Sequence, residues 1–157
     1  METVKYCQTW SRIKKEMVGP LSEEEAASLH SSNNSYTALI GGGRYPACFI
    51  EMVIDKAMVG VGFLDEMGRV YLTYQFQVVA NGKIFLTMAT WRKFDGEGDK
   101  VLSGESYIFS ESGELVIRRN RMVPYEVEEA NATFDPAGNY ENIPVFGDYS
   151  AVIKVER

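Results

Sequence analysis

The sequence contains little of what metal centres and nucleophilic enzymes require. Its 157 residues include two cysteines and one histidine. A disulfide framework, a structural zinc site or a histidine-rich metal site needs more of these residues. His30 stands at the end of a short polar helix signal, where a cation favours stability alone, so it gives no support for a Ser-His-Asp or Cys-His triad. We therefore expect no metal, no cofactor and no recognisable catalytic motif.

Long apolar runs are also missing. No stretch approaches the roughly 18 apolar residues that cross a bilayer, and the first 16 residues, METVKYCQTWSRIKKE, lack the apolar core of a signal peptide. We expect a cytoplasmic protein that does not enter a membrane.

Basic residues are also fewer than acidic residues. The formal net charge is −6 and the pI is near 4.9. Nucleic-acid binding depends on Lys and Arg that neutralise phosphates, so this balance argues against it. A basic protein is the macromolecular partner that the charge favours.

What the sequence does contain is typical of one globular domain. Hydrophobic residues make up 45% and charged residues 24%, far from the composition of a disordered chain. We expect a single domain over residues 1–157, with a helical N-terminal segment at 1–35 that packs on or caps a β-rich part at 36–157.

The N-terminal segment carries two helix signals. Ser22 and Glu25 have the spacing of a capping box, and the acidic first turn suits the helix dipole, so a short helix is predicted from there to His30. Residues 4–17 have apolar side chains at three- and four-residue spacings, which favours a second helix, with a strand as the alternative. These side chains are Val4, Cys7, Trp10, Ile13 and Met17.

From about residue 36 the pattern alternates and the turns are those of hairpins. The clearest is Asn81-Gly82, between runs at 70–79 and 83–94, where a two-residue type I′ turn is predicted. Such a turn pairs residue 80 with residue 83 and fixes the register of both strands. The predicted cross-strand pairs are Val78 with Phe85, Phe76 with Thr87, Tyr74 with Ala89 and Leu72 with Trp91.

This register predicts one aromatic and one mixed sheet face. The aromatic face provides the candidate ligand-binding residues, which are Leu72, Tyr74, Phe76, Phe85, Thr87 and Trp91. The mixed face provides the candidate partner-binding residues, which are Tyr71, Gln75, Gln77, Leu86, Met88 and Arg92. Self-association around Leu86 and Met88, giving a homodimer, is the simpler alternative for the mixed face.

Three further turns each lead from an aromatic residue through a polar stretch to glycine, at 63–70, 109–115 and 134–140. Glycine supplies the positive φ that such turns require. Further strands are predicted at 45–54, 57–64, 102–109, 114–121, 125–134 and 149–155, giving eight or nine in an antiparallel meander. A sheet of that length usually curls or closes, so we expect a β-barrel.

The hairpin Phe134-Asp135-x-x-Gly138-x-Tyr140 resembles a turn common in calycin-like proteins, the lipocalin-type barrels. The resemblance covers hairpin style and no family residues are carried over. It implies an up-and-down barrel whose interior is either packed solid or holds one small apolar molecule.

A group of basic residues and a group of acidic residues face each other across another predicted hairpin. They are Arg118, Arg119 and Arg121 on one strand and Glu126, Glu128 and Glu129 on the next. Opposite charges on neighbouring strands pair with one another, so we expect mutual ion pairs there.

Two functions of different classes fit these observations. In the first, the aromatic face lines a cavity for a small apolar molecule, and the protein is a carrier or a cofactor-free cyclase or isomerase that acts by positioning its substrate. In the second, the protein is an acidic inhibitor of the immunity type, which binds and neutralises a basic protein such as a toxin.

Overall fold

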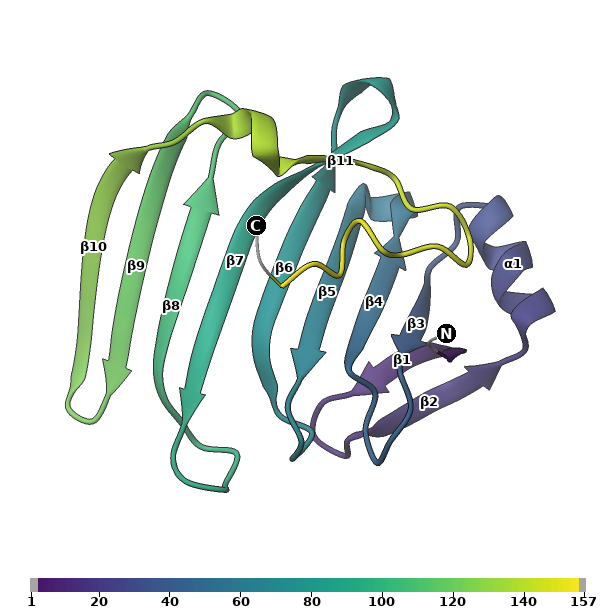
Figure 1. Cartoon of the computed structure of the whole chain (residues 1–157), viewed down its shortest axis with the longest axis horizontal. Coiled ribbons are helices and arrows are strands. Elements are labelled where there is room, and N and C mark those ends of the chain that lie inside the picture. The colour runs from purple at the N-terminus through teal and green to yellow at the C-terminus, as the bar shows by residue number, and fades with distance from the viewer. Residues whose placement is uncertain (1–2, 156–157) are drawn as a thin grey trace.

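The computed structural model describes residues 3–155, which form one antiparallel sheet with a single α-helix, α1 (Glu23–Ser31) (Figure 1). The strands are β1 (Val4–Ser11), β2 (Glu16–Leu21), β3 (Tyr36–Ile40), β4 (Cys48–Val53), β5 (Met58–Leu64), β6 (Val70–Val78), β7 (Lys83–Phe94), β8 (Val101–Phe109), β9 (Glu114–Met122), β10 (Tyr125–Thr133) and β11 (Tyr140–Asn142). Three short 3-10 turns are η1 (Ile54–Lys56), η2 (Ala80–Gly82) and η3 (Pro136–Asn139).

The sheet is an open meander. Its strand order is β10-β9-β8-β7-β6-β5-β4-β3-β1-β2, with β11 added beside β7. The hairpin predicted at 134–140 is therefore wrong, because the strand after η3 pairs with β7 instead of returning along β10. The prediction of a closed barrel is wrong, because β2 and β10 are free edges instead of partners. The antiparallel meander itself is confirmed, with eleven strands where eight or nine were expected.

The N-terminal residues form a hairpin, so the helix predicted over 4–17 is wrong and its strand alternative is right. β1 pairs with β2 on one side and with β3 on the other. Tyr6 is buried in one apolar cluster, while Cys7 and Trp10 are buried in a second one. A strand buried on both faces has no simple alternation, which explains the helix-like spacing.

The helix predicted after Ser22 is confirmed as α1. The Ser22 hydroxyl accepts from the Glu25 backbone N–H, and the Glu25 carboxylate accepts from the Ser22 N–H, which completes the capping box. The predicted strands correspond to β4–β10. The exception is 149–155, which is a turn and extended chain without strand pairing.

The two-residue loop predicted at Asn81-Gly82 is wrong in length. The hairpin after β6 has a three-residue loop, because the Val79 N–H bonds to the Lys83 carbonyl across η2. The predicted pairs Tyr74–Ala89 and Leu72–Trp91 are confirmed. The two pairs nearer the turn are wrong by one residue, since a bulge at Thr87 shifts the register there. The observed pairs are Val78 with Ile84 and Phe76 with Leu86.

The main core lies on the face of the sheet that carries residues 143–155, which we call the C-terminal segment. Figure 1 shows this segment crossing in front of β4–β6, and we call this the front face and the other the back face. The segment buries Tyr149 and Val152 against the sheet. The Tyr149 and Tyr36 hydroxyls are 2.9 Å apart, and the Tyr74 hydroxyl donates to the Val155 carbonyl at 2.6 Å.

α1 joins the same core. Ala26 is fully buried, and the His30 Nδ1 lies 2.7 Å from the Tyr36 hydroxyl. Burial raises the pKa of Tyr36 to about 12 and lowers the pKa of His30. Both groups are therefore neutral at pH 7, as buried hydrogen-bonded groups usually are. No helix within residues 3–155 is long and apolar enough to cross a membrane.

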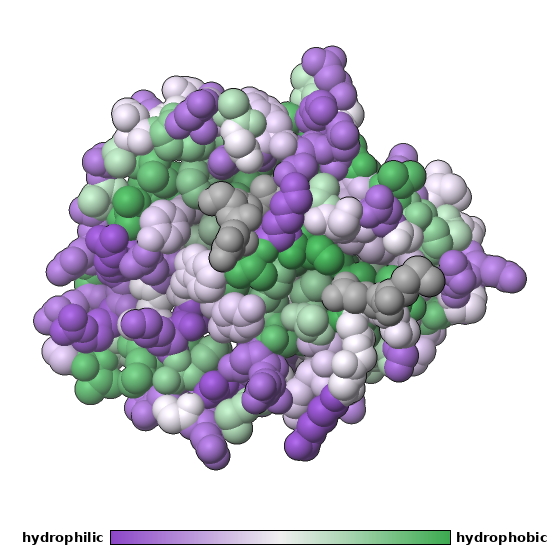
Figure 2. All heavy atoms as spheres, viewed as in Figure 1, coloured by the Kyte–Doolittle hydropathy of each residue, from purple (hydrophilic) through white to green (hydrophobic). Residues whose placement is uncertain are grey.

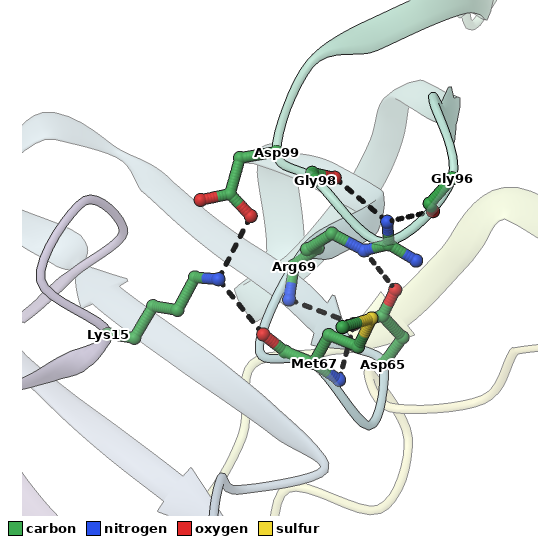
Figure 3. A network of polar contacts seen from close by, with 7 residues as sticks. All are labelled: Lys15, Asp65, Met67, Arg69, Gly96, Gly98 and Asp99. Carbon is green, nitrogen blue, oxygen red and sulfur yellow. Dashed lines mark hydrogen bonds and ion pairs between the residues drawn. The ribbon is translucent and has the colours of Figure 1, made fainter.

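On the back face, the β1–β2 hairpin folds against the sheet over a smaller cluster. The Phe49 ring of this cluster lies over Gly62, where a Cβ atom would sit 2.2 Å from ring carbons. Polar contacts hold the hairpin turn in place (Figure 3): the Lys15 ammonium reaches the Met67 carbonyl at 3.0 Å and the Asp99 carboxylate at 2.9 Å. Arg69 joins the same two loops through Asp65 and the carbonyls of residues 96 and 98.

We expect Gly62→Ala to lower the free energy of unfolding by about 1–3 kcal/mol, the usual cost of overpacking a core. The added methyl group would collide with the Phe49 ring. Urea unfolding measures the effect. Gly138→Ala is the control, because no atom lies within 4 Å of its Cβ position, and it should leave the unfolding midpoint nearly unchanged. Equal midpoints for the two variants would contradict the close packing of Phe49 on Gly62.

His30 should titrate below its usual pKa of 6.5 in the folded protein, because burial disfavours the charged ring. The unfolded chain binds this proton near pH 6.5, so the contribution of His30 to stability is complete above about pH 6.5 and declines as the pH falls below it. His30 is the only histidine, so a single imidazole NMR resonance reports the titration. A midpoint at or above 6.5 would contradict this environment.

Candidate functional site

A groove of about 550 Å³ lies on the front face where the C-terminal segment no longer covers the sheet. Strands β7, β8, β9 and β10 all contribute to it. The lining residues with side chains on this face are Trp91, Lys93, Ser103, Glu105, Tyr107, Arg119, Arg121, Glu126 and Glu128. They come together because directly paired residues of neighbouring strands share a face.

Aromatic rings form the apolar part of the groove. Trp91 is 40% exposed, and its ring lies 6.1 Å from that of Tyr71. Tyr71 in turn contacts Phe63, which packs edge-on against Tyr74 in the core. A continuous series of rings therefore joins the packed core to the open groove and holds Trp91 in place.

Charged side chains of both signs surround these rings. Arg119 donates to Glu105 at 2.8 Å, and the Tyr107 hydroxyl donates to the same carboxylate. Arg121 lies 3.8 Å from Glu126 across the β9–β10 hairpin. Figure 2 shows hydrophilic residues gathered over this side of the front face, with apolar patches between them.

The predicted pairing of the two charged groups is confirmed for two of the three arginines. Arg118 pairs with Glu129 at 2.7 Å, and Arg121 pairs with Glu126. Arg119 lies opposite Glu128 but reaches back to Glu105 on β8 instead. Within residues 3–155, Glu128 therefore has no ion-pair partner, and its carboxylate borders the groove.

The sheet beyond the groove is exposed on both faces. All nine residues of β10 are exposed, so no other part of the described chain covers them. Exposed large apolar residues accumulate here as well. Besides Trp91 they are Leu102, Val123, Tyr125 and Val127.

Most of the candidate ligand-binding residues lie in packed surroundings. Leu72, Tyr74 and Phe76 are at most 4% exposed and belong to the front-face core. Phe85 points to the back face because of the bulge, and its ring packs 4.8 Å from that of Tyr140. Thr87 is the bulge residue, whose hydroxyl donates to the Gln75 carbonyl. Trp91 alone of this set lines the groove.

The candidate partner-binding residues fall on two faces. Gln75, Met88 and Arg92 line a hollow on the back face, where Gln77 also points. The two bulges in β5–β7 place Tyr71 and Leu86 on the front face instead: Tyr71 stands beside Trp91, and Leu86 is 3% exposed in the core.

Several groove residues were not singled out as a site in the sequence. Tyr107 and Glu105 alternate on β8 in a segment that looks like any half-exposed strand. The sequence did contain one signal of this exposed surface: in β9 and β10, charged residues occur on both faces of each strand. A strand with no apolar face is an uncovered strand.

No family model matches this chain, and no curated protein or solved structure matches it either. The groove and its surroundings are therefore the basis for a functional assignment.

The open groove predicts different solvent access for the two tryptophans. Trp91 is 40% exposed and Trp10 is 8% exposed. Acrylamide should quench the fluorescence of a Trp10→Phe variant, which retains Trp91, more strongly than that of a Trp91→Phe variant. Equal quenching constants would show that something covers Trp91.

Proposed function

We propose that this chain is a binding protein that binds a basic protein partner on the open part of its sheet, β7–β10. The observation that carries the proposal is that β10 is exposed over its whole length while Trp91 remains 40% exposed in the groove that β10 borders. A soluble domain rarely leaves such a surface without a partner. The net charge of −6 favours a basic one.

The groove has the composition of a protein interface. Trp91 and Tyr107 supply amphipathic rings, and aromatic residues are enriched among the residues that dominate binding energy. Glu126 and Glu128 lie on β10, at the rim. Rim charges mainly speed encounter with an oppositely charged partner. The inhibitor or immunity class is the form of this function that a small acidic protein without a catalytic motif suggests.

A small apolar molecule is the second candidate occupant. A volume of about 550 Å³ lies within the range of ligand pockets, and the rings of Trp91 and Tyr71 offer an apolar wall. The ion pairs around the groove favour the protein partner, because sites for apolar ligands are lined mostly by apolar side chains. A carrier, cyclase or isomerase function belongs to this second candidate.

Native mass spectrometry of the protein purified from its own host tests the proposal. The expected result is a stoichiometric complex with a basic protein. Trp91→Ala should remove most of it, since truncating a central aromatic contact costs about 2 kcal/mol or more. A discrete small adduct that is lost on denaturation would overturn the proposal in favour of the second candidate.

Charge reversal gives a matched pair of variants. Glu128→Lys changes a β10 carboxylate that has no ion pair within the described chain, and Glu16→Lys makes the same change on β2, the opposite edge of the sheet. We expect the first to weaken the complex about fivefold, for roughly 1 kcal/mol of lost attraction, and the second to have little effect. Equal weakening of the complex by both variants would show that only the net charge of the protein affects binding, and would contradict binding of the partner at β10.

A further inference from the structure

A second polar hollow lies on the back face, over β4–β7. It measures about 260 Å³ and is bordered by β4–β7 and by Arg12, which follows β1 in the hairpin turn. Arg12 and Arg92 line it together with Glu51 of β4 and with neutral polar groups from β6 and β7. These neutral groups are Thr73, Gln75 and Thr90. A neighbouring hollow of about 380 Å³ has the same two arginines in its wall.

The positive charge in these hollows is only partly balanced. Lys15 pairs with Asp99 at 2.9 Å, and Arg69 pairs with Asp65 at 2.8 Å. Arg12 has a single longer contact, 3.5 Å to Glu51. These three cations each have an acidic partner.

Arg92 differs from them. It is partly buried, and among the described residues its guanidinium makes no ion pair. Its Nη1 contacts the neutral Thr73 hydroxyl at 3.4 Å. Burial lowers the pKa of Arg92, and the charge of Arg12 lowers it further. Arginine stays protonated nevertheless, so a partly buried cation shares the hollow with a second cation, and the one carboxylate in the lining, Glu51, contacts Arg12.

The arginines are held in position before any ligand arrives. Arg12 lies over the Phe49 ring, 5.3 Å from its centre. The turn that follows Arg12 is fixed by the Lys15 contacts to Met67 and Asp99 (Figure 3). Arg92 is part of β7, in the middle of the sheet. Such fixed donors lose little entropy on binding.

We propose that Arg12 and Arg92 form a binding site for an oxyanion, either free phosphate or the phosphate or carboxylate group of a small molecule. The planar guanidinium offers paired N–H donors that match the oxygens of these groups. The hydroxyls of Thr73 and Thr90 and the Gln75 amide complete a donor-rich lining. The side chains of this site lie on the opposite face from those that line the groove, although Arg92 of β7 borders both.

Titration with inorganic phosphate, with chloride at matched ionic strength as the reference, tests this site. In the wild-type protein we expect a saturable rise in the thermal midpoint and a shift of the Arg92 Nε–Hε resonance in the NMR spectrum. The NMR readout needs no variant, so it does not depend on the folding of a mutant. A response no larger than that to chloride would overturn the proposal, since it would reflect general screening.

Arg92→Gln should weaken phosphate binding about tenfold or more, because hydrogen bonds to charged groups are lost. Arg118→Gln is the matched control. It removes the same charge from an exposed arginine outside the hollow and should change the affinity less than about twofold. We expect Arg92→Gln to fold, since it removes an unpaired cation. Unchanged affinity in this variant would overturn the assignment.

Glycerol 3-phosphate and succinate distinguish the source of the oxyanion. Tighter binding of glycerol 3-phosphate than of phosphate would indicate the phosphate group of a small organic molecule, and equal binding would indicate free phosphate. Preferential binding of succinate would indicate a carboxylate group. Failure of this site would leave the partner complex on β7–β10 unaffected, because the two tests involve different faces and different variants.

Discussion

The return of the C-terminal segment across the sheet is the contact on which the main core depends. A single open sheet has two apolar faces to cover, and here one helix and one irregular segment cover the front. Hydrogen bonds satisfy the polar groups of that contact. One joins the Tyr36 and Tyr149 hydroxyls, and another runs from the Tyr74 hydroxyl to the Val155 carbonyl. Without the segment, the apolar side chains of β3–β6 would face water.

The limited reach of this cover divides the sheet into two parts. β3–β6 are packed on the front face, whereas β9 and β10 consist largely of exposed residues held by strand pairing and ion pairs. The groove forms at the boundary between the two parts, where the aromatic series reaches Trp91. Glutamates along β10 also discourage pairing of this edge with a second copy of itself, because like charges would meet across the new ladder.

Sequence reasoning found the elements that depend on local signals. The capping box located α1, and alternating apolar residues together with glycine turns located the strands from β4 to β10. It failed where burial came from distant parts of the chain. β1 is covered on both faces, so its buried residues, including Cys7 and Trp10, have the three-residue spacing that is also typical of a helix. The strand predicted at 149–155 is wrong for the same reason. Tyr149 and Val152 are buried there because their segment crosses the sheet, and it does so without strand pairing.

The site was accessible to the same reasoning only in part. Trp91 and Arg92 were identified as site candidates because they follow a strong hairpin signal. A bulge at Thr87 is invisible in the sequence, yet it decides the face of Phe85 and Leu86. Barrel closure was misjudged because strand number favours it, whereas the charged residues on both faces of β9 and β10 oppose it. Arg12 escaped notice, since its place beside Arg92 depends on how the β1–β2 hairpin folds onto the back face.

Strand pairing in this chain is almost entirely between neighbours in sequence, so each hairpin can form soon after it is synthesised. The C-terminal segment follows all eleven strands, and the contact that completes the core must therefore form last. On the ribosome, the nascent sheet keeps an uncovered apolar face until residues 143–155 have emerged. During that interval the chain resembles an aggregation-prone folding intermediate, and a chaperone that shields apolar surface would find its substrate there.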